Sequence, residues 1–138
     1  MTIRYPAIFV PEETGGFTVL FPDLEDTFTC GETEEECLFN AAEVLSAMLE
    51  VKLEDNDPIP PPSANVPGAR YVAPDAKTQA ALLVRFARGS RPLSEVARAL
   101  HTSWPAAKRL EDPRHWPSLK TLDKAAAALG KRLVLSFE

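Results

Sequence analysis

The chain has few of the residues that build metal centres and disulfide frameworks. It contains two cysteines and two histidines among 138 residues. Cys30 and Cys37 form no CxxC motif, and His101 and His115 lie far from both in the sequence. No metal-ligand spacing results. Two reduced thiols in a cytoplasmic protein are expected, and a single disulfide is the alternative.

Long apolar runs and catalytic motifs are also missing. No segment approaches the roughly 18 consecutive apolar residues of a membrane helix, so no membrane partner is expected. Residues 1–13 contain no small-residue cleavage site and predict a strand rather than a signal peptide. The sequence has no glycine-rich phosphate loop, no Ser/His/Asp set and no cluster of metal ligands. We therefore predict a protein without a catalytic site, a metal ion or a cofactor.

Basic residues are nearly absent from the first half of the chain. Residues 1–66 contain fourteen acids and only two bases, Arg4 and Lys52, which gives a net charge of −12. Residues 67–138 contain thirteen bases and six acids, a net charge of +7. The overall charge of −5 hides this division. The two halves suggest an acidic module for a cationic partner and a basic module for a polyanion.

The first residues predict a small antiparallel sheet. Residues 3–10 are rich in β-forming side chains, Gly15 and Gly16 allow a turn, and residues 17–21 alternate between two faces. Together these features predict a β-hairpin. A third strand is expected at about residues 27–30.

A long helix and an extended segment are expected next. Thr33 predicts the helix start, with Glu36 three residues later as in a capping box. Apolar residues at three- and four-residue steps extend the helix to about Lys52; they are Cys37, Leu38, Ala41, Val44, Leu45, Met48 and Leu49. Five prolines in residues 54–69 exclude helix there, and residues 70–73 predict one more strand.

From Asp75 onward the pattern is helical. Four helices are expected, at about 75–88, 93–100, 104–110 and 118–129. Asp75 and Ser103 are the expected N-caps of the first and third helices, and Gly89 and Gly130 are expected to end the first and last helices. Residues 131–137, with the sequence KRLVLSF, predict a final strand.

Residues 93–110 fit the spacing of a helix-turn-helix. Ala97 is the small residue where two helices cross closely. His101 occupies the turn position at which glycine is usual, because the turn commonly needs a positive φ. Pro105 lies in the first turn of the second helix, where its missing N–H is harmless. Any short pair of helices can satisfy this spacing, but the flanking helices and the +7 charge favour DNA binding.

The candidate DNA contacts lie in and after the second helix of this motif. They are Ser103, Trp104, Lys108, Arg109 and Arg114. The N-terminal end of such a helix enters the major groove, and the two exposed cations of the helix more often contact phosphates than bases. Trp104 is expected either to contact DNA or to pack half-buried, and Trp116 is expected to pack inside the domain.

Several short motifs follow one another in a characteristic order. They are Arg4-Tyr5-Pro6-Ala7, Glu13-Thr14-Gly15-Gly16-Phe17, Phe21-Pro22-Asp23-Leu24, Cys30-Gly31-Glu32-Thr33 and residues 57–63, DPIPPPS. Residues 93–110 and 126–131 continue the pattern. In this order the motifs resemble the HicB antitoxin family, in its variety with a C-terminal helix-turn-helix, and the likeness covers nearly the whole chain.

The resemblance implies an α+β fold with two domains. Residues 1–73, which include the Pro-rich segment 54–69, are expected to form a partial ribonuclease-H-like βββα(β) domain that binds a toxin. Residues 74–138 are expected to form a small helical helix-turn-helix domain, with a C-terminal strand, for DNA binding and dimerisation.

The resemblance also implies the partners. These are a small HicA-type toxin that cleaves mRNA, operator double-stranded DNA of the shared operon, and further copies of the chain in a homodimer or higher homo-oligomer. A basic toxin is the cationic partner that suits the acidic half. The candidate toxin-binding residues lie at the start of the Pro-rich segment; they are Glu54, Asp55, Asp57, Ile59 and Pro60.

Two other functions stay open at this point. One is a stand-alone helix-turn-helix repressor whose N-terminal domain senses a small ligand or only oligomerises. The other is a nuclease of the ribonuclease-H type. It is disfavoured because such a site holds metal ions with several carboxylates, one of them on the first strand, and residues 3–10 contain none.

Overall fold

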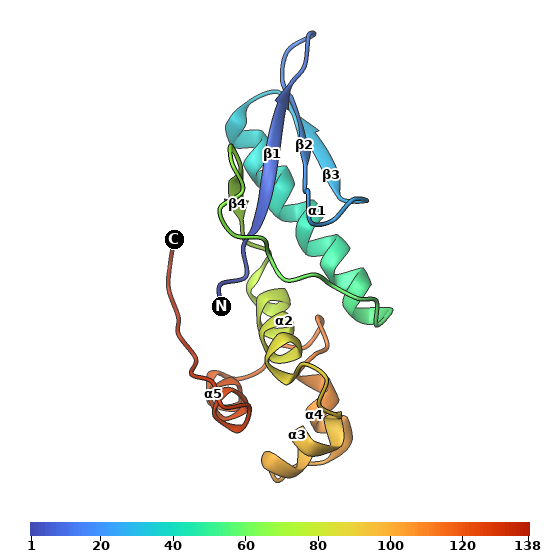
Figure 1. Cartoon of the computed structure of the whole chain (residues 1–138), viewed down its shortest axis with the longest axis vertical. Helices are drawn as coiled ribbons and strands as arrows, with labels where there is room; N and C mark the ends of the chain where they lie inside the picture. Colours follow the sequence, from blue (N-terminus) through green and yellow to red (C-terminus); the bar gives the residue numbers. More distant parts are fainter. The chain divides into compact units, whose positions relative to one another are not determined.

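The computed structural model describes all 138 residues and has a mixed α/β architecture (Figure 1). The chain divides into two compact units, Met1–Ala76 and Lys77–Glu138, which are described separately. The first unit contains a four-stranded antiparallel sheet and one long helix, and the second contains short helices only.

The first three strands form an antiparallel meander, which contains the predicted hairpin and the expected third strand. They are β1 (Tyr5–Pro11), β2 (Phe17–Leu20) and β3 (Phe28–Gly31). Gly16 in the β1–β2 turn has a φ of 76°, a conformation that glycine adopts without the steric cost of a Cβ. A Cβ at this position would also lie 2.5 Å from the carbonyl oxygen of Gly31, so the turn needs glycine for space as well.

Helix α1 (Glu34–Glu54) begins where the sequence predicted and ends two residues beyond Lys52. The hydroxyl of Thr33 accepts a hydrogen bond from the N–H of Glu36 at 3.1 Å, which confirms the predicted N-cap. In a capping box the Glu36 carboxylate would accept a hydrogen bond from the N–H of Thr33. Here it accepts instead from the N–H of the preceding residue, Glu32, at 3.4 Å. A negative side chain in the first turn still favours the positive end of the helix dipole.

One face of α1 packs through a four-residue repeat. Its buried residues are Cys37, Ala41, Leu45, Leu49 and Leu53. The expected apolar stripe was too wide, because Leu38 is 38% exposed and Val44 and Met48 are only partly buried. A helix that packs on a single sheet buries one narrow stripe of its surface and leaves the flanks in water.

The sheet has one face toward α1 and one face away from it. Gly31 lies so close to Cys37 of α1 that an added Cβ would be 2.8 Å from the sulfur. Its register partner Phe17 therefore also belongs to the helix side. Because side chains alternate along a strand, this side includes Val19 and Ala7, which are completely buried. No helix covers the opposite side of the sheet in the first unit (Figure 1).

Strand β4 (Arg70–Val72) pairs antiparallel with β1 and completes the sheet order β3-β2-β1-β4. The predicted strand at residues 70–73 is thereby confirmed. Residues 55–69, between α1 and β4, contain turns but neither helix nor strand, as their prolines predicted. We call residues 55–69 the strap.

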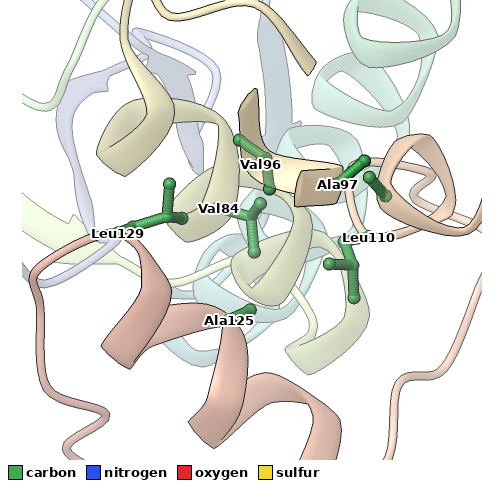
Figure 2. Packing of buried hydrophobic residues seen from close by; sticks show 7 residues of the cluster. Val84, Val96, Ala97, Leu110, Ala125 and Leu129 are labelled. Atoms are coloured by element: carbon green, nitrogen blue, oxygen red, sulfur yellow. The ribbon is translucent and has the colours of Figure 1, made fainter. Parts of the chain in front are cut away.

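The second unit consists of helices close to the predicted positions. They are α2 (Ala76–Arg88), α3 (Leu93–Ala99), α4 (Trp104–Arg109) and α5 (Leu119–Ala128). Their shared core is small (Figure 2) and consists of Val84, Val96, Ala97, Ala107, Leu110, Ala125 and Leu129. Three alanines in this core allow short helices to approach each other closely.

The final strand predicted at residues 131–137 is wrong for the single chain, because residues 131–138 form no regular element. A strand needs a neighbouring strand to pair its backbone N–H and C=O groups, and the second unit contains no other strand. The apolar side chains of this tail are exposed: Val134 by 79%, Leu135 by 64% and Phe137 completely.

Candidate functional site

Three side chains from the sheet and its loops hold the strap in place. The buried hydroxyl of Tyr5 donates a hydrogen bond to the carbonyl oxygen of Pro60 at 2.8 Å. The carboxylate of Asp23 accepts from both the N–H and the hydroxyl of Ser63, at 2.8 and 2.6 Å. Tyr71 donates to the carbonyl oxygen of Ser63 at 2.8 Å and accepts from the N–H of Val66 at 3.1 Å. The strap is therefore ordered before any partner binds.

The Tyr5 anchor is insensitive to physiological changes of pH. Burial raises the pKa of the Tyr5 phenol, and the negative charge of Asp23 raises this pKa further. The hydroxyl thus stays protonated and can donate to Pro60 throughout the neutral range. Asp23 lies in the Phe21–Leu24 motif that the sequence singled out, but its role as an anchor could not be read from local pattern.

The candidate toxin-binding residues lie together at the end of α1 and the start of the strap. Glu54, Asp55, Asp57 and Pro60 are exposed, and Ile59 is partly buried. Asn56 between them has a φ of 54°, a left-handed conformation that Asn tolerates better than most residues. This turn follows the end of α1 directly and places three carboxylates on four consecutive residues, 54–57. Such a cluster suits a cationic partner.

In the predicted helix-turn-helix segment, α3 ends in a left-handed turn. His101 has a φ of 52°, as expected for the position where glycine is usual. The N–H of Thr102 donates a hydrogen bond to the carbonyl oxygen of Ala97 at 2.9 Å. The N–H of His101 donates to the carbonyl oxygen of Arg98 at 3.1 Å. This pair of bonds is a Schellman motif, which satisfies carbonyls at the end of the helix. A non-glycine residue at this φ carries a steric cost.

Helix α4 starts with the cap that the sequence predicted and presents four of the five candidate DNA contacts. Ser103 accepts a hydrogen bond from the N–H of Ala106 at 3.2 Å. Ser103, Trp104, Lys108 and Arg109 are all exposed. The Lys108 ammonium lies 5.2 Å from the centre of the Trp104 ring, a cation–π distance. An exposed cation beside an exposed aromatic ring on a short helix can contact a polyanion.

The remaining candidate contact, Arg114, and the second tryptophan, Trp116, lie after α4. Arg114 is exposed, and its N–H bonds to the Asp112 carboxylate at 2.9 Å, so this residue stands in the loop rather than on α4. The expectation that Trp116 packs inside the domain is wrong, because its side chain is 65% exposed. The core of this unit consists of alanine, valine and leucine side chains and does not include Trp116.

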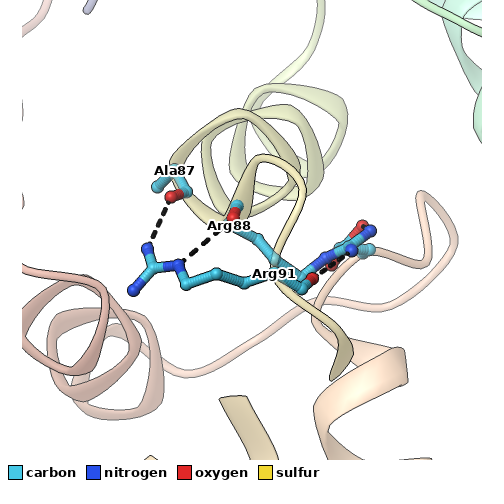
Figure 3. Close-up of polar contacts among 4 residues, drawn as sticks. Ala87, Arg88 and Arg91 are labelled. Carbon is cyan, nitrogen blue, oxygen red and sulfur yellow. Dashed lines mark hydrogen bonds and ion pairs between the residues drawn. The ribbon is translucent and has the colours of Figure 1, made fainter. Parts of the chain in front are cut away.

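The second unit contains an internal ion pair that the sequence did not predict. Arg88, the last residue of α2, donates two hydrogen bonds to the Glu111 carboxylate at 2.6 and 2.9 Å. Both side chains are largely buried, with exposures of 18% and 11%. Arg88 also donates to the carbonyl of Arg91, and Arg91 donates back to the carbonyls of Ala87 and Arg88 (Figure 3). The hydrogen bonds to Glu111 raise the pKa of Arg88.

This ion pair joins three segments of the second unit. It connects the end of α2, the turn before α3 and the residues that follow α4. A bidentate arginine–carboxylate pair fixes both distance and orientation. Because α4 carries the candidate DNA contacts, the pair helps to set the direction of that helix within its unit.

In this structure, no group of three or more His, Cys, Asp or Glu residues could hold a metal ion. Cys30 is an exposed free thiol, while burial raises the pKa of the free Cys37 thiol, with the Glu36 charge adding to the effect. The helices are all too short or too polar to cross a lipid bilayer.

The chain is similar to known proteins over nearly its whole length. Residues 4–80 match a family model described as the HicB_like antitoxin of bacterial toxin-antitoxin systems. Antitoxin HicB 1 of Photorhabdus laumondii subsp. laumondii is 32% identical over 136 residues, which are 99% of this chain and 88% of that protein. Antitoxin HicB of Escherichia coli strain K12 is 30% identical over 135 residues, 96% of this chain and 98% of that protein.

Proposed function

The chain belongs to the HicB-like antitoxin family of bacterial toxin–antitoxin systems, and on that premise we propose that it has two partners. Its first unit binds and neutralises a small HicA-type toxin that cleaves mRNA in the cytoplasm. Its second unit binds operator DNA and represses the operon that encodes both proteins. Neither task requires catalysis by this chain.

The observation that carries the proposal is the separation of charge between two compact units. Residues 1–76 have fifteen acids and three bases, a net charge of −12, and residues 77–138 have twelve bases and five acids, a net charge of +7. A toxin that binds RNA must be basic where it contacts phosphate, so it is attracted to the first unit and repelled by the second. DNA is a polyanion, so it is repelled by the first unit and attracted to the second. Each unit thus selects its own partner.

The strap supports the assignment of toxin binding to the first unit. Its anchors at Tyr5, Asp23 and Tyr71 order the segment in advance, so little conformational entropy is lost when a partner docks. In the proposed complex, Glu54, Asp55, Asp57, Ile59 and Pro60 lie across the RNA-binding face of the toxin. The four-stranded sheet with its single long helix is compatible with the partial ribonuclease-H-like fold that the family implies.

The α3–turn–α4 segment supports the assignment of DNA binding to the second unit. We assign it as a helix-turn-helix whose second helix, α4, enters the major groove with Ser103, Trp104, Lys108 and Arg109. Arg114 contacts a neighbouring phosphate. The exposed apolar tail at residues 131–137 pairs with the tail of a second copy, and the resulting two-fold symmetry predicts an inverted-repeat operator.

Two measurements on the full chain test this function. In the first, the chain is titrated into an RNA-cleavage assay with the neighbouring toxin; cleavage is expected to stop near equimolar chain. In the second, the chain is titrated onto DNA from its own promoter region, where specific binding is expected. Operator binding without any inhibition of the toxin would instead support the stand-alone repressor. Undiminished cleavage together with no operator binding would contradict both functions.

A further inference from the structure

The side of the sheet that faces away from α1 carries an ordered set of apolar side chains. The register places Ile8 opposite Leu20, and Leu20 opposite Phe28; in the next row it places Val10 opposite Thr18, and Thr18 opposite Cys30. Since side chains alternate along strands, these residues all lie on the side opposite Val19 and Gly31. We call these six residues, two rows across three strands, the open face.

Several apolar side chains of the open face are exposed to solvent. Phe28 is 62% exposed, Leu20 44% and Val10 39%, whereas Val19 on the helix side is completely buried. An antiparallel sheet with one solvated side usually carries polar residues there, but five of these six residues are apolar. A contiguous exposed apolar patch on a folded protein commonly marks a binding surface.

The strap borders the open face and leaves most of it uncovered. Tyr71 lies opposite Pro6 in the register, on the same side of the sheet as Ile8. The Tyr71 hydroxyl binds the strap at Ser63 and Val66, and Pro6 is fully buried. The strap therefore lies over this side near Pro6 and β4, whereas Val10 of β1 and the open-face residues of β2 and β3 remain accessible.

Carboxylates border the exposed part of the open face. The Glu12 carboxylate accepts a hydrogen bond from the hydroxyl of Thr18, which places it on this side of the sheet. Glu32 follows β3 directly and is exposed. Of the three bases in the unit, Lys52 is paired with Asp26, and Arg70 is paired with Glu34 on the helix side. The open face thus combines an apolar centre with a negative border.

An apolar centre with a negative border favours a basic protein as the binding partner of the open face. A second copy of the same acidic unit would bring two net charges of −12 together, and like charges across an interface oppose association. A basic protein with an apolar patch gains both hydrophobic burial and charge complementarity. We propose that the open face is a docking surface for the basic toxin, an inference that rests on the proposed toxin binding. Phe28 and Leu20 contact its apolar patch, and Glu12 and Glu32 contact its cations.

A matched pair of phenylalanine substitutions in the full chain tests this proposal. Phe28→Glu places a charge in the open face, and Phe39→Glu makes the same change on α1, where Phe39 is 67% exposed. Binding of a catalytically inactive toxin is measured by calorimetry. Phe28→Glu is expected to weaken binding about 30-fold or more, as for a central interface aromatic. Phe39→Glu is expected to change it by less than about threefold.

Thiol labelling of the unsubstituted chain provides an independent readout. Cys30 is exposed on the open face and Cys37 is completely buried, so N-ethylmaleimide reports on Cys30. Saturating toxin is expected to slow alkylation of Cys30, as mass spectrometry would measure, by about tenfold or more because the docked protein excludes the reagent. Because no substitution is needed, this result does not depend on how a variant folds.

The outcomes separate the proposed function from the docking surface. If the unsubstituted chain does not bind the toxin, the proposed function fails and the docking surface fails with it. If that chain binds while Phe28→Glu binds equally well, or while Cys30 stays fully reactive in the complex, the docking surface alone is wrong. A Phe28→Glu variant that loses self-association but keeps its toxin affinity would assign the open face to a second copy instead.

Discussion

The two units of this chain hold their shape with different groups from those that they offer to partners. In the first unit, Tyr5, Asp23 and Tyr71 fix the strap, while the carboxylates at residues 54–57 stay exposed. In the second, Arg88 and Glu111 neutralise each other, while the cations of α4 stay exposed. Structural and binding contacts can therefore be altered separately, and so can the two binding tasks.

The largest expected effect comes from breaking the internal ion pair of the second unit. Glu111→Ala leaves the largely buried Arg88 guanidinium without its carboxylate, and the free energy of unfolding of this unit is expected to fall by about 3 kcal/mol. Operator binding should weaken while toxin neutralisation is retained. Calorimetric unfolding and DNA titration measure these effects. The control Glu95→Ala removes an exposed carboxylate and is expected to cost at most about 0.5 kcal/mol.

The second effect is on association with the toxin. Changing Glu54, Asp55 and Asp57 together to Lys reverses the charge at the start of the strap, and the association rate at low salt is expected to fall about tenfold or more. Association should also become less sensitive to salt. Stopped-flow mixing measures the rate.

A matched triple on α1 separates local charge from total charge. Glu35, Glu36 and Glu43 changed together to Lys alter the net charge by the same amount but lie in the first half of α1, whereas the strap follows the last residue of that helix. This control should slow association less than the strap triple. Fast association of the strap triple with unchanged salt dependence would mean that these carboxylates do not attract the toxin electrostatically.

The Tyr5 anchor predicts a specific alkaline response. Tyr5→Phe removes the donor to Pro60 and is expected to cost about 1 kcal/mol of unfolding free energy. Because the pKa of Tyr5 is raised in the folded state, its contribution is complete below the unfolded value of about 10 and is lost as pH rises above it. Denaturant unfolding from pH 8 upward should show a steeper alkaline decline for the unsubstituted chain. Equal declines in both proteins would contradict the role of Tyr5.

The exposed cations of α4 are expected to contribute to DNA binding but not to toxin binding. Lys108→Ala and Arg109→Ala should each weaken operator binding and lower the magnitude of the log–log salt slope by about 0.9 for each phosphate that is no longer neutralised. Lys124→Ala on α5 is the control and should leave the slope unchanged. Toxin neutralisation should be intact in all three variants. A folded α4 variant that fails to protect cells from the toxin would contradict the division of tasks.

The smallest expected effect lies in the turn between α3 and α4. His101→Gly relieves the cost of a side chain at positive φ but increases the freedom of the unfolded chain, and the net gain in stability is expected to be about 0.5 kcal/mol. Chemical denaturation of the full chain measures it, with Thr102→Gly as a control that should destabilise. A loss of stability in His101→Gly would mean that the imidazole makes a favourable contact that outweighs the strain.

The sequence predicted the elements that depend on local chemistry. The β1–β2 hairpin follows from alternation and two glycines, and the starts of α1 and α4 follow from Thr33 and Ser103, whose hydroxyls cap the next turn. The left-handed residue at His101 also follows from the spacing of the turn. Each of these signals spans only a few neighbouring residues, so it can be recognised without knowledge of the rest of the fold.

The contacts that organise the candidate sites could not be predicted in this way. Tyr5 and Pro60 are 55 residues apart in the sequence, and Arg88 and Glu111 are 23 apart. Nothing in the local pattern of either residue indicates its partner, because the pairing depends on how the elements pack. The errors at Trp116 and the C-terminal tail have the same origin: apolar composition predicted burial, but the neighbours needed for burial or strand pairing are absent from the single chain.

The position of the strap anchors has a consequence for the order in which the protein is made. Tyr5, Asp23 and Tyr71 all precede residue 76, as does every group that they bind. Domains commonly fold as units during synthesis, the N-terminal one first. We therefore expect the nascent chain to display a finished strap before α3 to α5 have folded. The toxin-binding surface then becomes available before the surface for DNA, and neutralisation takes precedence over repression in every newly made molecule.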